Sequence, residues 1–208
     1  QKTAYEIVSR DWSSDVCSSD LDSAFTEEQL QQICDIGDAL ELQKGTIYGG
    51  ADEEQTKKIR RSKVKFIEKD NNSSWIFDTF NFVGQSLNNQ YYNFNLNGYR
   101  TIQYTVYDSA EQGMYNWHMD TILGSNLGNS WDGDTRKLTL ILLLSEPEVD
   151  FKGGELEINL GREDSPDTPV FPRGRILAFP SFMIHRVKPV LAGTRKSVVV
   201  WIEGPKFI

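Results

Sequence analysis

Short segments in which apolar and polar residues alternate recur through the second half of the chain, and this period of two constrains the fold most. Ile102, Tyr104 and Val106 alternate first, as in a strand with one buried face. Six further segments of strand length follow, separated by Gly, Pro, Asn and Asp: 114–120, 137–145, 155–160, 175–179, 183–187 and 196–202. Many short strands with turn residues between them predict two packed sheets, as in a β-sandwich or jelly roll.

Two helical patterns precede these strands. Thr26 can cap a first helix and Gln29 can bond back to it, while Phe25 can pack on Leu30. A second apolar stripe follows helical spacing through residues 74–89. The domain is therefore expected to be mainly β with flanking helices, with a helical buttress over about 22–90 and a β core over about 91–205.

The start of the β core carries a hairpin signal. Tyr92, Phe94 and Leu96 alternate up to Asn97-Gly98, a dipeptide that two-residue hairpin turns favour. We therefore expect a strand over 91–97 that pairs with the segment beginning at Ile102.

The first 21 residues differ from the rest. They show no sustained period of 2 or 3.6, and their second half is rich in Ser and Asp. They also resemble a translated sequencing-adapter read, which would make Cys17 incidental. We predict that residues 1–21 are a non-native or disordered tail and that residues 22–208 form a single domain.

Composition excludes several classes of protein. The 208 residues, 38% hydrophobic and 25% charged, fit one globular domain, and no apolar run approaches the ~20 residues of a membrane span. A net charge of −8 and a pI near 4.9 argue against nucleic-acid binding through clustered cations. Only two cysteines are present, so a disulfide-stapled scaffold is excluded and a cytoplasmic location is expected. The oligomeric state stays open.

The chain contains only two histidines, His118 and His185. Alternation along 114–120 places His118 and Asp120 on one face of a strand, with Tyr115, Trp117 and Met119 on the other. The segment between Asp120 and His185 is long enough to cross the sheet several times and bring the His185 imidazole opposite the first pair. Two His and one carboxylate on one side of a metal are the ligands of non-haem Fe(II) oxygenases. An isolated His-x-Asp is common by chance, and a structural role for either histidine is the alternative.

Arg195 follows ten residues after His185. Alternation places it on one strand face with Ser197, Val199 and Trp201. A guanidinium that faces an apolar interior is costly without an anion to pair with. A dicarboxylate would supply that anion, and the Ser197 hydroxyl would add a second donor. The distal carboxylate of 2-oxoglutarate fits this position.

Four further segments complete a pattern with these residues: 136–139 (RKLT), 151–156 (FKGGEL), 174–181 (GRILAFPS) and 185–190 (HRVKPV). Over residues 62–205 the chain resembles the Fe(II)/2-oxoglutarate-dependent dioxygenases of the prolyl 4-hydroxylase superfamily, above all the PKHD-type hydroxylases of bacteria and phages. The resemblance implies a double-stranded β-helix in which His118, Asp120 and His185 hold Fe(II) and Arg195 anchors 2-oxoglutarate. It also implies O2 as a cosubstrate and ascorbate as a further cofactor.

Family members often contact the cosubstrate through a tyrosine nine or ten residues before the first His. Tyr107 is the closest match, eleven residues before His118, and Tyr104 is the competitor. Both tyrosines could equally be core aromatics.

The resemblance implies hydroxylation of an unactivated C–H bond in a prolyl or other amino-acid residue, with release of succinate and CO2. A peptide or small-molecule substrate is expected, and neither a nucleic acid nor a membrane. Two alternatives remain: a nucleobase-oxidising dioxygenase, which the acidic balance disfavours, and a non-catalytic β-sandwich binding module with a relic metal site. The polar segment 124–134 is expected to be a lid that contacts substrate, or else a solvated connector.

Overall fold

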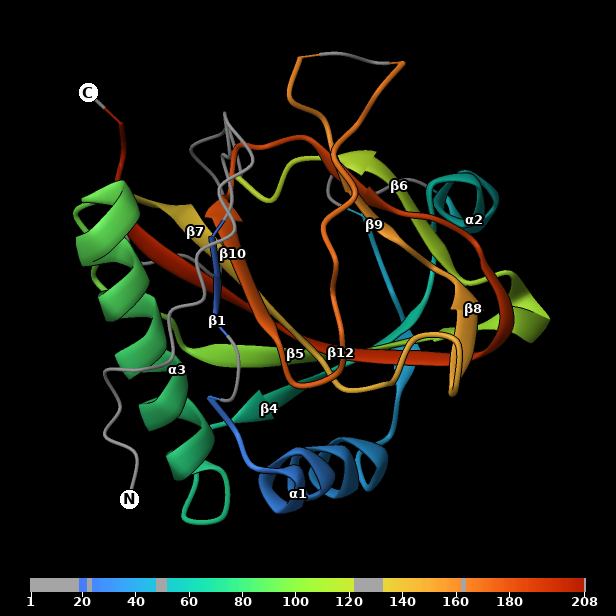
Figure 1. The fold of residues 1–208 in the computed structure, drawn as a ribbon, viewed down its shortest axis with the longest axis horizontal. Helices are drawn as coiled ribbons and strands as arrows, with labels where there is room; N and C mark the ends of the chain where they lie inside the picture. The colour runs from blue at the N-terminus through green and yellow to red at the C-terminus, as the bar shows by residue number, and fades with distance from the viewer. Residues whose placement is uncertain (1–18, 22–23, 48–51, 122–132, 162–163, 208) are drawn as a thin grey trace.

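Two β-sheets face each other in the computed structural model, and two helices pack against the outer side of the larger sheet (Figure 1). The structure describes residues 19–21, 24–47, 52–121, 133–161 and 164–207. The fold is mainly β with flanking helices, a double-stranded β-helix of the jelly-roll type, as the sequence predicts.

The larger sheet has eight strands. In spatial order they are β1 (Ser19–Leu21), β10 (Ile176–Pro180), β7 (Asp134–Leu143), β12 (Val190–Pro205), β5 (Thr101–Asp108), β4 (Lys63–Glu68) and β2 (Gln43–Lys44), with β8 (Phe151–Gly153) paired to one end of β12. The smaller sheet has four strands, in the order β3 (Arg60–Arg61), β6 (Met114–His118), β11 (His185–Val187) and β9 (Leu156–Ile158). Most of the predicted strands are present, and β12 extends well beyond the predicted segment 196–202 at both ends.

Three α-helices lie within the described residues: α1 (Glu27–Asp38), α2 (Glu53–Ile59) and α3 (Ser74–Leu87). The predicted capping box at the start of α1 is confirmed, because Thr26 Oγ1 accepts from Gln29 N and Gln29 Oε1 accepts from Thr26 N. Cys34, on the buried face of α1, is 6% exposed and is a core residue as predicted.

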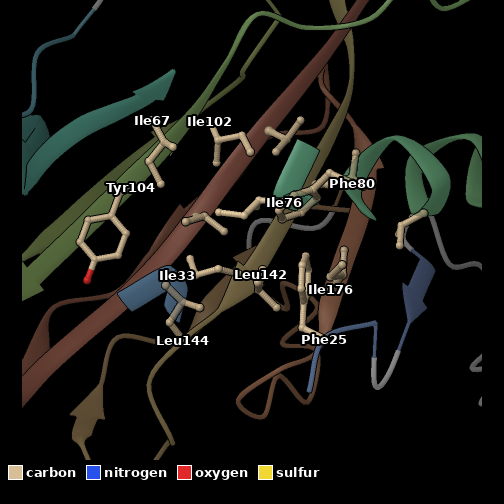
Figure 2. Close-up of a cluster of buried hydrophobic side chains, with 14 of the residues drawn as sticks. Phe25, Ile33, Ile67, Ile76, Phe80, Ile102, Tyr104, Leu142, Leu144 and Ile176 are labelled. Atoms are coloured by element: carbon tan, nitrogen blue, oxygen red, sulfur yellow. The ribbon is translucent and has the colours of Figure 1, made fainter. Parts of the chain in front are cut away.

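The main core lies between these helices and the larger sheet (Figure 2). Ile33 of α1 and Phe80 of α3 pack against alternate residues of the strands, among them Ile102 and Leu142. The intervening residues of the same strands face the smaller sheet, for example Gln103 on β5. Because successive side chains of a strand point to opposite faces, one strand supplies both the apolar core and the lining of a cavity.

The predicted hairpin at Asn97-Gly98 is wrong. Helix α3 runs on into a π-helical turn, η1 (Asn88–Tyr92), and no strand forms over 93–97. The Asn88 side chain holds this connection, since Nδ2 donates to the Phe94 carbonyl and Oδ1 accepts from Phe94 N. Tyr92 and Phe94 pack against the main core. Their alternation therefore arises from packing over a helix end, not from strand pairing.

Residues 19–21 form β1, which pairs antiparallel with β10. They come from the last part of the segment predicted as a tail, and residues 1–18 lie outside the described residues. None of the helices in the described part of the chain is long and apolar enough to cross a bilayer.

Candidate metal centre

A cavity of about 950 Å³ lies between the two sheets and holds every predicted site residue. Strands β6 and β11 of the smaller sheet supply His118 and His185, and Asp120 follows the end of β6. Strand β12 of the larger sheet supplies Arg195 and Ser197 to the same cavity. The fold thus brings together residues that are far apart in the sequence.

The two histidines and the aspartate converge closely. His118 and His185 are direct partners across β6 and β11. His118 Nε2 lies 3.7 Å from Asp120 Oδ1, and His185 Nε2 lies 3.5 Å from Asp120 Oδ2. One donor atom from each residue lies within 4.8 Å of the other two. This is one cluster of two imidazole nitrogens and one carboxylate oxygen, the donor set of a non-haem Fe(II) site.

Backbone carbonyls orient both imidazoles. His118 Nδ1 lies 2.8 Å from the Asn116 carbonyl oxygen, and His185 Nδ1 lies 2.9 Å from that of Met183. A carbonyl can only accept, so each Nδ1 carries the proton and donates it. Each Nε2 is then left with a lone pair that faces the carboxylate, which is how neutral histidine binds a metal.

Asp120 is 7% exposed and is held by polar neighbours. Thr139 Oγ1 donates to Asp120 Oδ2 over 2.9 Å and contacts Ser181 Oγ at the same distance. The Asp120 amide donates to the Ser181 carbonyl. These contacts fix the carboxylate that would share the metal with the histidines, as in the outer shells of known metal sites.

The local electrostatics keep His118 and Asp120 in the form that binds a cation. Burial lowers the pKa of His118 to about 3, with a further contribution from His185, so its imidazole is neutral near pH 7. Burial alone would raise the pKa of Asp120, but His185, His118 and Arg136 outweigh this effect and the pKa lies below its ordinary value. Asp120 is therefore ionised near neutral pH.

Arg195 is 2% exposed and projects from β12 into the cavity. Its Nη1 donates to Ser197 Oγ over 3.2 Å, and its guanidinium carbon lies 5.5 Å from the Tyr107 ring centre. No carboxylate in the described part of the chain forms an ion pair with it. Burial lowers its pKa, with Tyr107 acting in the opposite direction. A buried guanidinium without a counter-ion suits an anionic ligand.

The structure separates the two candidate tyrosines. Tyr107 lines the cavity beside Arg195. Tyr104 points to the other side of β5, is packed in the main core, and donates its hydroxyl to Asp38 over 2.7 Å. Only Tyr107 is therefore placed to contact a ligand in the cavity, and its contact with the cosubstrate stays a prediction.

Tyr115 lies on the opposite face from the one predicted. It stacks on His118 with ring centres 3.5 Å apart and lines the cavity. The register explains this: His118 and Tyr115 are three residues apart on β6, whereas their partners on β11, His185 and Val187, are two apart. This bulge on β6 shifts the alternation by one residue.

A second bulge brings Arg136 into the cavity. On β7, Leu138 pairs with Ile202 and Arg136 pairs with Glu203, so β7 has one residue more than β12 at this point. The Arg136 guanidinium lies 3.8 Å from the ring centre of Trp201. Simple alternation from Leu138 would have placed Arg136 on the face of the larger sheet that packs against the helices.

Sequence reasoning did not assign roles to Arg60, Arg136 and Thr139. Arg136 and Thr139 stand in the RKLT segment, which carried the resemblance, and that segment was the only signal for them. Arg60 reaches the cavity because β3 pairs with β6, and the polar segment around it gave no signal for a strand. The predicted lid over 124–134 lies outside the described residues except for its last two positions.

Comparison with known proteins shows which family the chain resembles. Residues 102–203, which carry all the predicted site residues, match the model of the 2OG-Fe(II) oxygenase superfamily. The match spans 102 of the 208 residues, and this part of the chain is similar to that superfamily. It is 36% identical over 90 residues to a PKHD-type hydroxylase of Synechococcus sp. strain CC9605, covering 43% of this chain and 36% of the relative. With a PKHD-type hydroxylase of Acaryochloris marina it shares 34% identity over 107 residues, or 50% of this chain and 44% of the relative. The chain thus spans less than half of each relative.

Solved structures of prolyl hydroxylases have the same fold. A Pseudomonas putida prolyl-4-hydroxylase superposes with a TM-score of 0.67 at 18% identity, covering 91% of this chain and 93% of that one. A Trichoplax adhaerens prolyl hydroxylase, solved in complex with a hypoxia inducible factor oxygen degradation domain peptide fragment, superposes with a TM-score of 0.68 at 20% identity, covering 89% and 82%.

Proposed function

We propose that this protein is an Fe(II)- and 2-oxoglutarate-dependent dioxygenase that hydroxylates a C–H bond of a prolyl or other amino-acid residue and releases succinate and CO2. The observation that carries the proposal is one cavity that contains both the His118, Asp120 and His185 cluster and the buried Arg195, which forms no ion pair within the described residues. A metal site alone, or a buried arginine alone, would indicate this class of enzyme less specifically. Both together match a metal with a dicarboxylate cosubstrate.

Each residue has a defined task in this mechanism. His118, Asp120 and His185 would hold Fe(II), which with 2-oxoglutarate and O2 supplies the oxidising power for hydroxylation. Arg195 would pair with the distal carboxylate of 2-oxoglutarate, helped by the Ser197 hydroxyl, and so orient the keto-acid end. The protein contributes positioning and the exclusion of water.

The cavity next to the metal centre suits an amino-acid side chain. Tyr115 and Trp201 both line it and give part of its wall an aromatic character, with Tyr115 stacked on His118 and the Arg136 guanidinium over Trp201. A prolyl ring is compact and apolar, so these walls support a prolyl substrate. The peptide bound to the Trichoplax adhaerens hydroxylase supports a peptide as the carrier of that residue. A cytoplasmic location is consistent with Cys34 being a free thiol buried in the core.

The test is an anaerobic reconstitution with Fe(II), followed by addition of O2, 2-oxoglutarate and ascorbate. Succinate release that requires Fe(II) and O2 is expected from the parent protein. Asp120→Ala should abolish iron retention without unfolding the protein, because one ligand is lost and the sheets remain. If the metal content is the same in parent and variant, the assignment of the ligands is wrong.

The substrate is identified by mass. Prolyl peptides, free amino acids and single-stranded oligonucleotides are each incubated with the reconstituted enzyme, and the gain of one oxygen atom is measured. Oxygen gain by a peptide is expected. Gain by an oligonucleotide would favour the nucleobase-oxidising alternative. Failure of the reconstituted protein to retain iron or to form succinate would favour a binding module with a relic site.

A further inference from the structure

Arg60 is a second buried cation in the cavity that has no carboxylate partner in the described part of the chain. It is 8% exposed. Its Nε donates to Ser62 Oγ over 2.8 Å and its Nη1 donates to the Thr46 carbonyl over 3.0 Å. Both acceptors are neutral, and no carboxylate in the described residues forms an ion pair with Arg60. A buried guanidinium in this state gains most from an anion that enters the cavity.

Arg60 lies on the metal side of the cavity. Strand β3 pairs with β6 so that Arg60 is opposite Tyr115, and its guanidinium carbon lies 4.7 Å from the Tyr115 ring centre. That ring stacks on His118, one of the proposed metal ligands. Arg195 is instead close to Tyr107. Tyr107 lies within the electrostatic influence of both arginines, since each opposes the rise in its pKa that burial causes.

The charges that line the cavity favour the binding of a dianion. Among the described residues, four arginines and three carboxylates line it: Arg60, Arg100, Arg136 and Arg195, with Glu68, Asp120 and Glu203. A divalent cation at the triad would add two positive charges to this near balance. 2-Oxoglutarate carries two negative charges at opposite ends, and Arg195 can pair with only one of them. The carboxylate next to the keto group would enter beside the metal ligands, where Arg60 is located.

We propose that Arg60 binds the metal-side carboxylate of 2-oxoglutarate, so that the cosubstrate is held by one buried arginine at each end. This inference rests on the proposed function, because it requires 2-oxoglutarate in the cavity. It makes Arg60 a cosubstrate-binding residue. A purely structural role, in which Arg60 only ties β3 to Ser62 and Thr46, is the alternative that the experiment must separate.

The experiment measures equilibrium binding of two 2-oxo acids to protein loaded with Mn(II) under anaerobic conditions, by isothermal titration calorimetry. 2-Oxoglutarate has both carboxylates, and 2-oxopentanoate has only the one next to the keto group. Arg60→Gln should weaken the binding of both acids about 10- to 100-fold, the usual range for loss of a charged hydrogen bond. Arg195→Gln should weaken only 2-oxoglutarate and leave 2-oxopentanoate within about twofold.

Arg61→Gln is the matched control, because Arg61 is the neighbouring residue of β3 and its Nε donates to the Gln112 carbonyl at the protein surface. Both affinities should stay within about twofold in this variant. Arg60→Lys keeps the charge but loses the planar fork, and should show a smaller loss with the same ligand pattern. It replaces Arg60→Gln if the latter does not fold, as judged by circular dichroism.

Two results would overturn the inference: unchanged affinity of the Arg60 variants for both acids, or a loss confined to 2-oxoglutarate. The second result would mean that Arg60 acts on the distal carboxylate. If the parent protein does not bind 2-oxoglutarate in the presence of Mn(II), the proposed function itself fails. That outcome is recognised from the parent alone, before any variant is compared.

Discussion

Replacing Thr139 by valine tests how strongly the residues behind the metal ligands control the site. Thr139 is fully buried, and its hydroxyl donates to Asp120 Oδ2 over 2.9 Å and contacts Ser181 Oγ. Valine has nearly the same shape but removes the donor. A hydrogen bond to a charged group contributes about 1.5–3 kcal/mol to stability, so the free energy of unfolding should fall by about that amount. Loss of such a supporting contact also weakens metal binding by roughly 10- to 100-fold.

The assay combines two measurements on the metal-free protein. Urea denaturation gives the change in free energy of unfolding, and competition with a fluorescent chelator gives the Mn(II) dissociation constant. Thr105→Val is the matched control: Thr105 is equally buried on the same sheet, and its hydroxyl accepts from Gln103 rather than contacting the triad. It should lower stability without changing metal affinity. If Thr139→Val binds Mn(II) within twofold of the parent, the hydroxyl does not orient Asp120 and the reasoning is refuted.

Two further predictions concern stability. The folded protein holds the pKa of His118 at about 3, whereas the unfolded chain protonates it from about pH 6.5 downward. The metal-free protein should therefore lose about 2 kcal/mol of stability between pH 7 and pH 5. His118→Gln should flatten this dependence, and an equal slope in parent and variant would contradict the assignment. In Gly37→Ala, the added Cβ would lie 2.6 Å from Cζ of the buried Tyr104. The crowding should cost about 1–3 kcal/mol, more than the ~1 kcal/mol gained in helix propensity. Gln32→Ala, at an exposed position of α1, is the control, and equal melting temperatures for the two variants would contradict the clash.

Local patterns correctly predicted which side chains of one strand share a face and where the first long helix begins. Period-two alternation placed Arg195, Ser197, Val199 and Trp201 on one face of β12, and all four line the cavity. The capping box defined where α1 begins. These features depend only on neighbouring residues and on the fixed geometry of strands and helices, so a single sequence contains enough information for them.

Alternation failed where the pairing of strands departs from regular register. The bulge on β6 moved Tyr115 into the cavity, and the bulge on β7 did the same for Arg136. A bulge is defined by the count of residues on two strands together, and the partner strand is distant in the sequence. The aromatic alternation before Asn97-Gly98 failed for a related reason, because packing over the end of α3 took precedence over a local turn preference.

The sequence by itself determined the kinds of chemical groups in the site: two imidazoles, one nearby carboxylate and one arginine on an otherwise apolar strand. Only the tertiary structure decided that Thr139 and Ser181 support the carboxylate and that Arg60 and Tyr115 stand beside His118. The physical reason is that residue type and spacing follow the covalent chain, whereas hydrogen bonds and ring contacts follow distances across strands that only the folded sheets bring together.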